Sequence, residues 1–324
     1  MESLISATDL KGFWRLHHTP DSPISNSPML QLHSGQLGLM VSVDQTYALH
    51  ASGQGQLMGI DALGLSGQFD ITINNTGMAI KRNLGAIQID VAHDSANVDT
   101  ISGQQLTLLV PSFARLTGDF SFEQTGPPAS QHVRLIGIAS GQLEHHSQVV
   151  DQAQVELSLT AGAPVLNLAT HDQTYTWIGP GATLGGVGDP SRHLTNHGLF
   201  SPGYSPAITQ EATFTQGAAD SLKIELGGLT PGAGAAGDED NGYDQVKVTG
   251  LATLGGTLVV ELINGFTPAV GQTFDILTFG SVSGKFSNAT GLFGFGDGSR
   301  YLSIEQQSDR LRLTVKQLGL EFLT

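Results

Sequence analysis

Short runs in which apolar and polar residues alternate, separated by glycine turns, constrain the fold of this chain most. Residues 243–286 read YDQVKVTGLATLGGTLVVELINGFTPAVGQTFDILTFGSVSGKF. Val246 and Val248 alternate with polar neighbours, and Leu258, Val260 and Leu262 repeat the pattern. A side-chain period of two in runs this short predicts β-strands with one buried face.

Glycine content extends this prediction to the whole chain. There are 42 glycines in 324 residues, roughly twice the usual share of about 7%. They follow no collagen-like period, so they fit many strands joined by tight turns. Residues 2–14 are the one modest candidate for a helix, because no other segment sustains apolar residues at helical spacing. The sequence therefore predicts an all-β protein.

The charge balance restricts the partners. Lys and Arg total 14 against 29 Asp and Glu, a formal net charge of −15. Such a surface repels phosphate backbones and anionic lipid, so we expect neither nucleic-acid binding nor membrane insertion. No apolar run reaches the roughly 18 residues of a membrane-spanning helix. The chain has no cysteine, which rules out disulfides and is shared by many bacterial surface proteins.

Two segments of the N-terminal half resemble each other. They are ALGLSGQFDITINNTG, residues 62–77, and ARLTGDFSFEQTG, residues 114–126. Gly67 and Gly118 lie 51 residues apart, as do Phe69 and Phe120. The string Ser-Gly-Gln, interpreted as a turn, recurs at 34–36, 52–54, 102–104 and 140–142. A period near 50 residues predicts units that bury apolar faces against their neighbours.

We expect three segments: strand-rich repeat units over 1–150, Gly/Pro-rich connecting β turns over 151–215, and a C-terminal β module over 216–324. The final strand alternates Leu311, Leu313 and Val315 with basic residues. Lys and Arg on a terminal strand are typical of an edge protected against further pairing, so the sequence predicts a finished edge there.

The C-terminal third carries a family resemblance. The pieces are GLFSPGYSPAI, LKIELGGLTPG, the 243–286 segment up to DILT, and VSGKF, spread over about residues 199–316. In this order they resemble the passenger-like β-strand repeat regions of bacterial autotransporters and related large exported surface proteins. Tyr204 departs from the pattern, which more often has Asn before Ser-Pro. The resemblance implies a right-handed parallel β-helix, and an extracellular or cell-surface location.

Candidate sites are sparse. The acidic loop around Asp238, Glu239 and Asp240, together with Asp244, offers oxygen ligands for Ca²⁺ beside glycine and asparagine, but without EF-hand spacing. His193 and His197 have the H-x3-H spacing of a metal pair, although in a Gly/Pro-rich segment. The pairs His17-His18 and His145-His146 are interpreted as exposed polar residues. Carboxylates available to a β-helix polysaccharide enzyme are Asp70, Asp90, Asp94, Glu123 and Asp151, and no spacing pairs them.

We therefore predict an elongated right-handed β-solenoid, with tandem β-sandwich domains as the alternative fold. The predicted function is a structural stalk, adhesin or filament subunit of a bacterial repeat protein, without catalysis and without a cofactor other than Ca²⁺. The alternatives are a β-helix polysaccharide-processing enzyme and a glycan-binding adhesin. Expected partners are neighbouring repeats, further copies that form fibres through open solenoid ends, and glycans.

Overall fold

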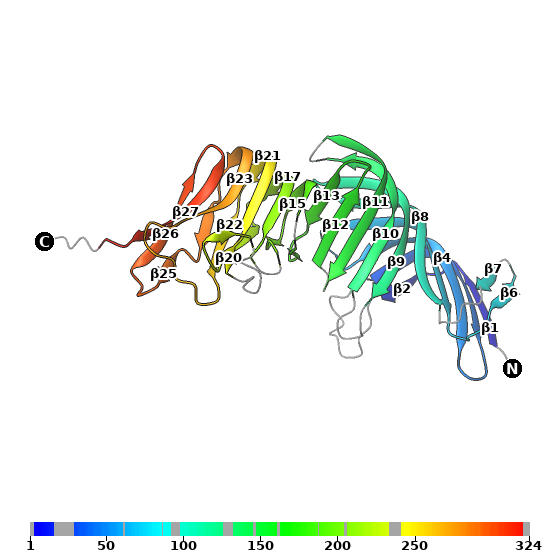
Figure 1. Cartoon of the computed structure of the whole chain (residues 1–324). Coiled ribbons are helices and arrows are strands. Elements are labelled where there is room, and N and C mark those ends of the chain that lie inside the picture. Colours follow the sequence, from blue (N-terminus) through cyan, green and yellow to red (C-terminus); the bar gives the residue numbers. More distant parts are fainter. Residues whose placement is uncertain are drawn as a thin grey trace. The chain divides into compact units, whose positions relative to one another are not determined.

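The computed structural model describes residues 3–15, 29–60, 62–85, 87–91, 98–125, 132–144, 147–160, 163–186, 188–203, 206–232 and 241–319. Strands account for 72% of the structure, and no helix occurs in these ranges. The all-β prediction is confirmed. Residues 2–14, the one modest candidate for a helix, form strands β1 and β2 in their described part. The chain divides into two compact units, Met1–His171 and Asp172–Thr324, which are described separately (Figure 1).

Unit 1 is built on an antiparallel meander of long strands. Its strands are β1 (Ser3–Thr8), β2 (Gly12–Arg15), β3 (Met29–Val41), β4 (Tyr47–Met58), β5 (Gly64–Asn74), β8 (Val98–Val110), β9 (Ala114–Thr125), β10 (His132–Leu143), β11 (Gln148–Thr160) and β12 (Ala163–Ala169). β1 and β2 both pair with β3, and from β3 to β12 each strand pairs with the next one in this list. All these pairings are antiparallel, so unit 1 departs from the parallel arrangement of a β-helix.

One face of this meander is apolar and the other polar, as the period of two requires. Buried side chains on the apolar face include Phe69, Ile71, Leu108, Leu116, Leu135 and Leu157. Across successive strands Gly53, Phe69, Gly103, Phe120 and Gly137 lie opposite one another. Each of the two phenylalanines is thus flanked by glycines, an arrangement that covers otherwise bare backbone. The 51-residue repeat therefore corresponds to β5 and β9, two equivalent positions in one sheet.

The Ser-Gly-Gln strings at 34–36, 52–54, 102–104 and 140–142 lie inside strands β3, β4, β8 and β10, and a fifth, at 66–68, lies inside β5. Their interpretation as turns is therefore wrong. The register shifts at or beside the string in β3, β5, β8 and β10. A Cβ on Gly137 would lie 2.1 Å from the backbone oxygen of Asp119, and one on Gly141 would lie 2.1 Å from that of Arg115. β9 and β10 approach so closely here that only glycine fits.

A two-stranded hairpin covers part of the polar face. β6 (Ile80–Leu84) pairs with β7 (Ile87–Val91), and the hairpin packs over β3 and β4. Ile80, Ile89 and Val91 form a small core with Met40 and Ala48. The hairpin thus buries the apolar residues that interrupt the polar face at this end of β3 and β4.

Unit 2 consists mainly of two parallel sheets whose strands alternate along the chain. The first sheet contains β13 (Thr174–Ile178), β15 (Asp189–Asn196), β17 (Ile208–Gln216), β21 (Gln245–Leu254) and β23 (Thr273–Gly284). The second contains β14 (Thr183–Leu184), β16 (Leu199–Phe200), β18 (Ser221–Leu226), β22 (Thr257–Leu262) and β24 (Asn288–Thr290). The chain therefore passes from the first sheet to the second and back, pairing each strand with the one before it in the same sheet.

The apolar residues of both sheets form the core of unit 2. Phe200 of the second sheet and Phe214 of the first are fully buried, with ring centroids 5.9 Å apart. Val246, Val248 and Leu258 are buried, which confirms the alternation predicted from the sequence. The Gly/Pro-rich segment contains the strands β14, β15 and β16.

A short excursion and an antiparallel cap complete unit 2. β19 (Thr230–Pro231) and β20 (Gly242–Tyr243) form the base of an excursion between β18 and β21. β25 (Phe293–Phe295), β26 (Arg300–Gln306) and β27 (Arg310–Gln317) follow β24. β27 pairs antiparallel with both β23 and β26, so it is an inner strand. The prediction of a finished edge at the last strand is therefore wrong: its arginines contact the neighbouring strand.

Candidate functional site

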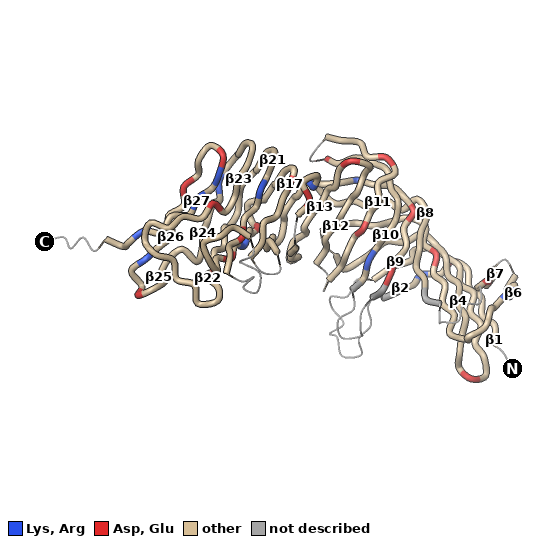
Figure 2. The backbone as a smooth tube through the Cα atoms, in the orientation of Figure 1, with Lys and Arg blue, Asp and Glu red and all other residues tan. Residues whose placement is uncertain are grey.

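A depression of about 940 Å³ lies on the polar face of unit 1, over β8 to β12. Gly118 and Gly137 line it, and a Cβ on either glycine would lie 2.1 Å from a backbone oxygen of the neighbouring strand. Its polar lining residues are uncharged except for two acids: Ser102, Gln104, Thr117, Asp119, Ser121, Ser140, Gln152, Gln154, Glu156 and Asn167. Apolar residues line it as well: Phe120, Ile136, Ile138, Ala139, Val155 and Ala169. Charged residues are few along these strands (Figure 2).

Two isoleucines interrupt this polar surface. In the register of the sheet Ile138 lies between Asp119 of β9 and Gln154 of β11. Its side chain is 51% exposed, and Ile136 lies two residues away on the same face. The depression therefore offers an apolar strip flanked by hydrogen-bonding groups, which is the combination that small polar ligands with an apolar side require.

Local hydrogen bonds hold several wall residues in place. Gln105 donates its backbone N–H to Asp119 Oδ1 at 2.8 Å. Ser140 donates to Asp151 Oδ1 at 2.7 Å and accepts the backbone N–H of Gln152 at 2.9 Å. Gln105 and Gln152 both have positive φ, which marks extra residues inserted into the sheet. Of these two glutamines, Gln152 lines the depression.

The Ser-Gly-Gln string is the sequence signal for this surface. In Ser-Gly-Gln the serine and glutamine point to one face of a strand, and the glycine lies between them on the other face. Gln54 lies opposite Gln68, and Gln68 lies opposite Gln104. The amides of Gln54 and Gln68 are hydrogen-bonded at 3.1 Å. The recurring string thus encodes polar rows across the sheet.

The carboxylates considered for catalysis have separate partners. Asp70 contacts His50 Nε2 at 2.9 Å, and this contact raises the histidine's pKa. Asp90 pairs with Lys81 at 2.7 Å, and Glu123 lies 3.5 Å from Arg134, which also contacts Glu156. Asp151 accepts from Ser140, as described above, and Asp94 lies outside the described residues. None of the described four is paired with another.

Of the calcium candidates only Asp244 is described, since Asp238, Glu239 and Asp240 fall outside the described residues. Asp244 is fully buried at the base of the excursion. Its Oδ1 accepts the backbone N–H of Ala207 at 2.9 Å, and its Oδ2 accepts that of Glu225 at 2.8 Å. Burial raises the pKa of this carboxyl to about 7, although the two N–H groups oppose the shift. Both carboxylate oxygens of Asp244 thus accept hydrogen bonds from the backbone. A calcium site involving Asp244 stays a prediction.

The H-x3-H histidines lie beside different partners. His193 stacks on Tyr175 with ring centroids 4.9 Å apart, and its Nδ1 lies 3.0 Å from the hydroxyl of Thr213. His197 Nδ1 lies 3.2 Å from Asp220 Oδ2. No group of three or more metal-ligating side chains occurs in the described part of the chain. The pairs His17-His18 and His145-His146 lie outside it.

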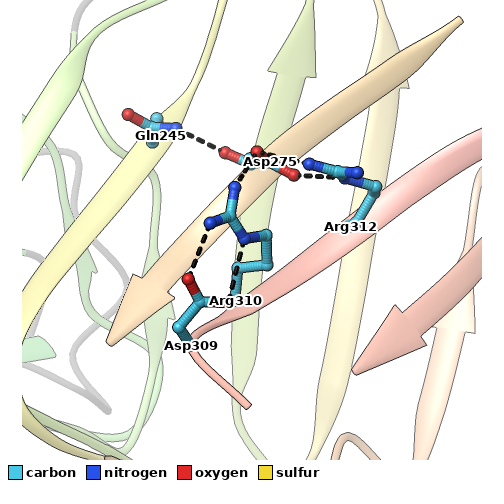
Figure 3. A network of polar contacts seen from close by, with 5 residues as sticks. All are labelled: Gln245, Asp275, Asp309, Arg310 and Arg312. Carbon is cyan, nitrogen blue, oxygen red and sulfur yellow. Dashed lines mark hydrogen bonds and ion pairs between the residues drawn. The ribbon is translucent and has the colours of Figure 1, made fainter. Parts of the chain in front are cut away.

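A network of charged side chains links the first parallel sheet of unit 2 to its antiparallel cap (Figure 3). Asp275 of β23 accepts from Arg312 Nε at 2.6 Å, from Arg312 Nη2 at 2.9 Å and from Arg310 Nη1 at 2.7 Å. These arginines lower the pKa of Asp275. Gln245 of β21 donates to the backbone oxygen of Asp275 at 2.6 Å. The network therefore joins strands β21, β23 and β27 and stabilises the fold of unit 2.

No family model, curated protein or solved structure matches this chain. Within the described ranges, no helix is long and apolar enough to cross a membrane.

Proposed function

We propose that this chain is a structural module of a bacterial extracellular or cell-surface repeat protein, a stalk, adhesin or filament subunit that performs no catalysis. The observation that supports this proposal best is the strand pairing within unit 2. Five successive strands of one sheet pair in parallel, and so do five successive strands of the other sheet. Such pairing is the signature of a β-solenoid, in which each coil buries its apolar side chains against the next.

The finer fold that we propose for unit 2 is a right-handed solenoid. Parallel crossover connections within one sheet are right-handed in nearly all proteins. Polar contacts between coils support the same arrangement: Asn196 donates to Gln216 at 3.1 Å, and Gln216 donates to the backbone oxygen of Gly255 at 2.8 Å. Both amides are buried at the corner after β15 and β17.

Small-angle X-ray scattering and thermal unfolding of the intact chain test this proposal. A stalk or filament subunit has an elongated distance distribution and unfolds at the same temperature with and without candidate small ligands, whereas a glycan-binding adhesin is stabilised by its glycan. A compact, near-spherical distribution contradicts the proposal. So does saturable turnover of a substrate by the purified protein.

A second candidate function is glycan binding in the unit 1 depression. The supporting observation is the apolar strip of half-buried Ile136 and exposed Ile138 beside amides and carboxylates. A sugar ring presents C–H groups on its face and hydroxyls around its edge, which such a strip can contact. The acidity of the chain favours neutral glycans over anionic ones.

A glycan array with wild type, Ile138→Asp and Val149→Asp tests that function. Val149 is 75% exposed in β11 and does not line the depression, so its variant is the matched control. Binding that Ile138→Asp removes and Val149→Asp keeps supports the site. The polysaccharide-processing alternative is tested by release of reducing ends or unsaturated products from a polysaccharide panel.

A further inference from the structure

His50 of β4 lies between the sheet of unit 1 and the β6–β7 hairpin, and both nitrogens of its ring face hydrogen-bond acceptors. Nε2 lies 2.9 Å from Asp70 Oδ2 on β5, and Nδ1 lies 3.0 Å from the backbone oxygen of Gln88 on β7. An ionised carboxylate and a carbonyl oxygen only accept hydrogen bonds, whereas a neutral imidazole has a single N–H. Both contacts are therefore hydrogen bonds only when the ring carries two protons and a positive charge.

The hairpin packs on the sheet directly beside this histidine. Gly38 of β3 lies opposite His50 in the register of the sheet. A Cβ on Gly38 would lie 3.0 Å from side-chain atoms of both Ile87 and Ile89, so the hairpin fills the space above this glycine. These apolar contacts do not change with pH. The polar contact through His50 does, because it depends on the charge of the ring.

Few other charges lie on the elements around this contact. Strands β1, β3, β4 and β5 contain no Asp, Glu, Lys or Arg except Asp70. On the hairpin, Lys81 pairs with Asp90 at 2.7 Å, and Arg82 Nη1 donates to the backbone oxygen of Lys81 at 3.1 Å. Asp, Lys and Arg side chains ordinarily keep their charge between pH 6 and pH 9, whereas histidine changes its charge there. His50 is thus the group at this contact whose charge depends on pH in that range.

We propose that protonated His50 is a latch that holds the β6–β7 hairpin on the sheet and releases it as the pH rises. The hydrogen bond with Asp70, and more weakly that with Gln88, raises the pKa of His50 above its ordinary value of 6.5, although burial opposes the shift. The stabilisation of the closed hairpin is therefore fully present below pH 6.5 and is lost as the pH rises through the raised pKa. Above that pH the Asp70 carboxylate faces a ring nitrogen without a proton. This latch does not depend on the function proposed above.

Hydrogen exchange followed by mass spectrometry tests the latch on the intact chain. The amide protection of residues 80–91, relative to the exchange rate of an unfolded chain at the same pH, reports how often the hairpin opens. In the wild type this protection is expected to fall about tenfold from pH 6 to pH 9, the equilibrium equivalent of one hydrogen bond to a charged group. The protection of β9 and β10 at each pH verifies that the rest of the sheet stays folded.

Asp70→Asn separates the latch from a general effect of pH. An amide at position 70 can donate to Nε2 of the neutral ring while Nδ1 donates to Gln88, so both hydrogen bonds form without a charge. The hairpin of this variant is expected to keep its protection at pH 9. In His50→Gln the protection is expected to be independent of pH, whatever its level. His33→Gln removes an exposed histidine of β3 and, as the matched control, is expected to keep the wild-type pH dependence.

Equal hairpin protection at pH 6 and pH 9 in the wild type overturns the proposal. So does a fall of wild-type size in either Asp70→Asn or His50→Gln. If His50→Gln does not fold, the wild-type series and Asp70→Asn decide between the outcomes.

Discussion

Replacing Asp244 by Asn is expected to change how the stability of unit 2 depends on pH. This carboxyl has a pKa of about 7 in the folded chain, because it is buried, against 3.8 in the unfolded chain. The folded state therefore holds the proton more tightly. Its contribution to stability is fully present below pH 3.8 and is lost as the pH rises through 7.

The size of this effect follows from the two pKa values. One unit corresponds to about 1.4 kcal/mol, so the wild type loses up to about 4 kcal/mol between pH 4 and pH 7 from this group. Asparagine cannot ionise, and it replaces one of the two oxygens that accept backbone N–H groups, at a cost of about 1–3 kcal/mol. Asp244→Asn is therefore less stable than wild type at pH 4, and the difference shrinks or reverses by pH 8.

Urea unfolding followed by tryptophan fluorescence measures this difference. Trp177 is buried in unit 2, and Trp14→Phe removes the second of the two tryptophans. Asp297→Asn is the control in the same background. Asp297 lies in an exposed turn where Ser299 lowers its pKa, so its substitution has little effect between pH 5 and pH 8.

A free-energy difference between Asp244→Asn and its parent that is constant or widens from pH 4 to pH 8 refutes the reasoning. Calcium is added in a parallel series. If Asp244 belongs to a calcium site, the ion raises the unfolding midpoint of the parent more than that of the variant.

Three further outcomes are expected. Asp275→Ala destabilises unit 2 by about 1–3 kcal/mol, and this difference diminishes as acid protonates Asp275, whose pKa is lowered in the folded chain; urea unfolding at pH 7 and pH 3 measures both. Gly137→Val prevents the close approach to β9 and lowers the thermal unfolding temperature of unit 1, whereas Gly64→Ala, with open space at its Cβ, does not. Glu211→Gln, which leaves Arg192 without its buried partner, costs about 3–5 kcal/mol in urea unfolding.

Much of unit 2 was predictable from its sequence, because its signal is local. Val246 and Val248, like Leu258 and Val260, occupy every second position of a strand. This spacing fixes which side chains enter the core, and glycines lie at the corners between strands. The pairing partner of each strand is not local. The position of β27 between β23 and β26 depends on contacts of Asp275 with Arg310 and Arg312, 35 and 37 residues away.

Unit 1 was harder to predict, and for a different reason. A glycine inside a polar string such as Ser-Gly-Gln is usual in a turn, and nothing adjacent in sequence distinguishes it from a bend within a long strand. The distinguishing information is the residue opposite, such as Phe69 beside Gly53 and Gly103. The depression at β8–β12 has the same origin, because its floor exists only once several strands are aligned.

The glycine–phenylalanine row of unit 1 makes these positions mutually dependent. A larger side chain at Gly137 competes for the space that the ring of Phe120 now fills, 2.7 Å from where a Cβ would be. Loss of that ring would in turn leave the glycine backbone bare. Substitutions along this row are therefore tolerated in compensating pairs more readily than singly, and a redesign of this sheet must change each glycine together with its aromatic neighbour.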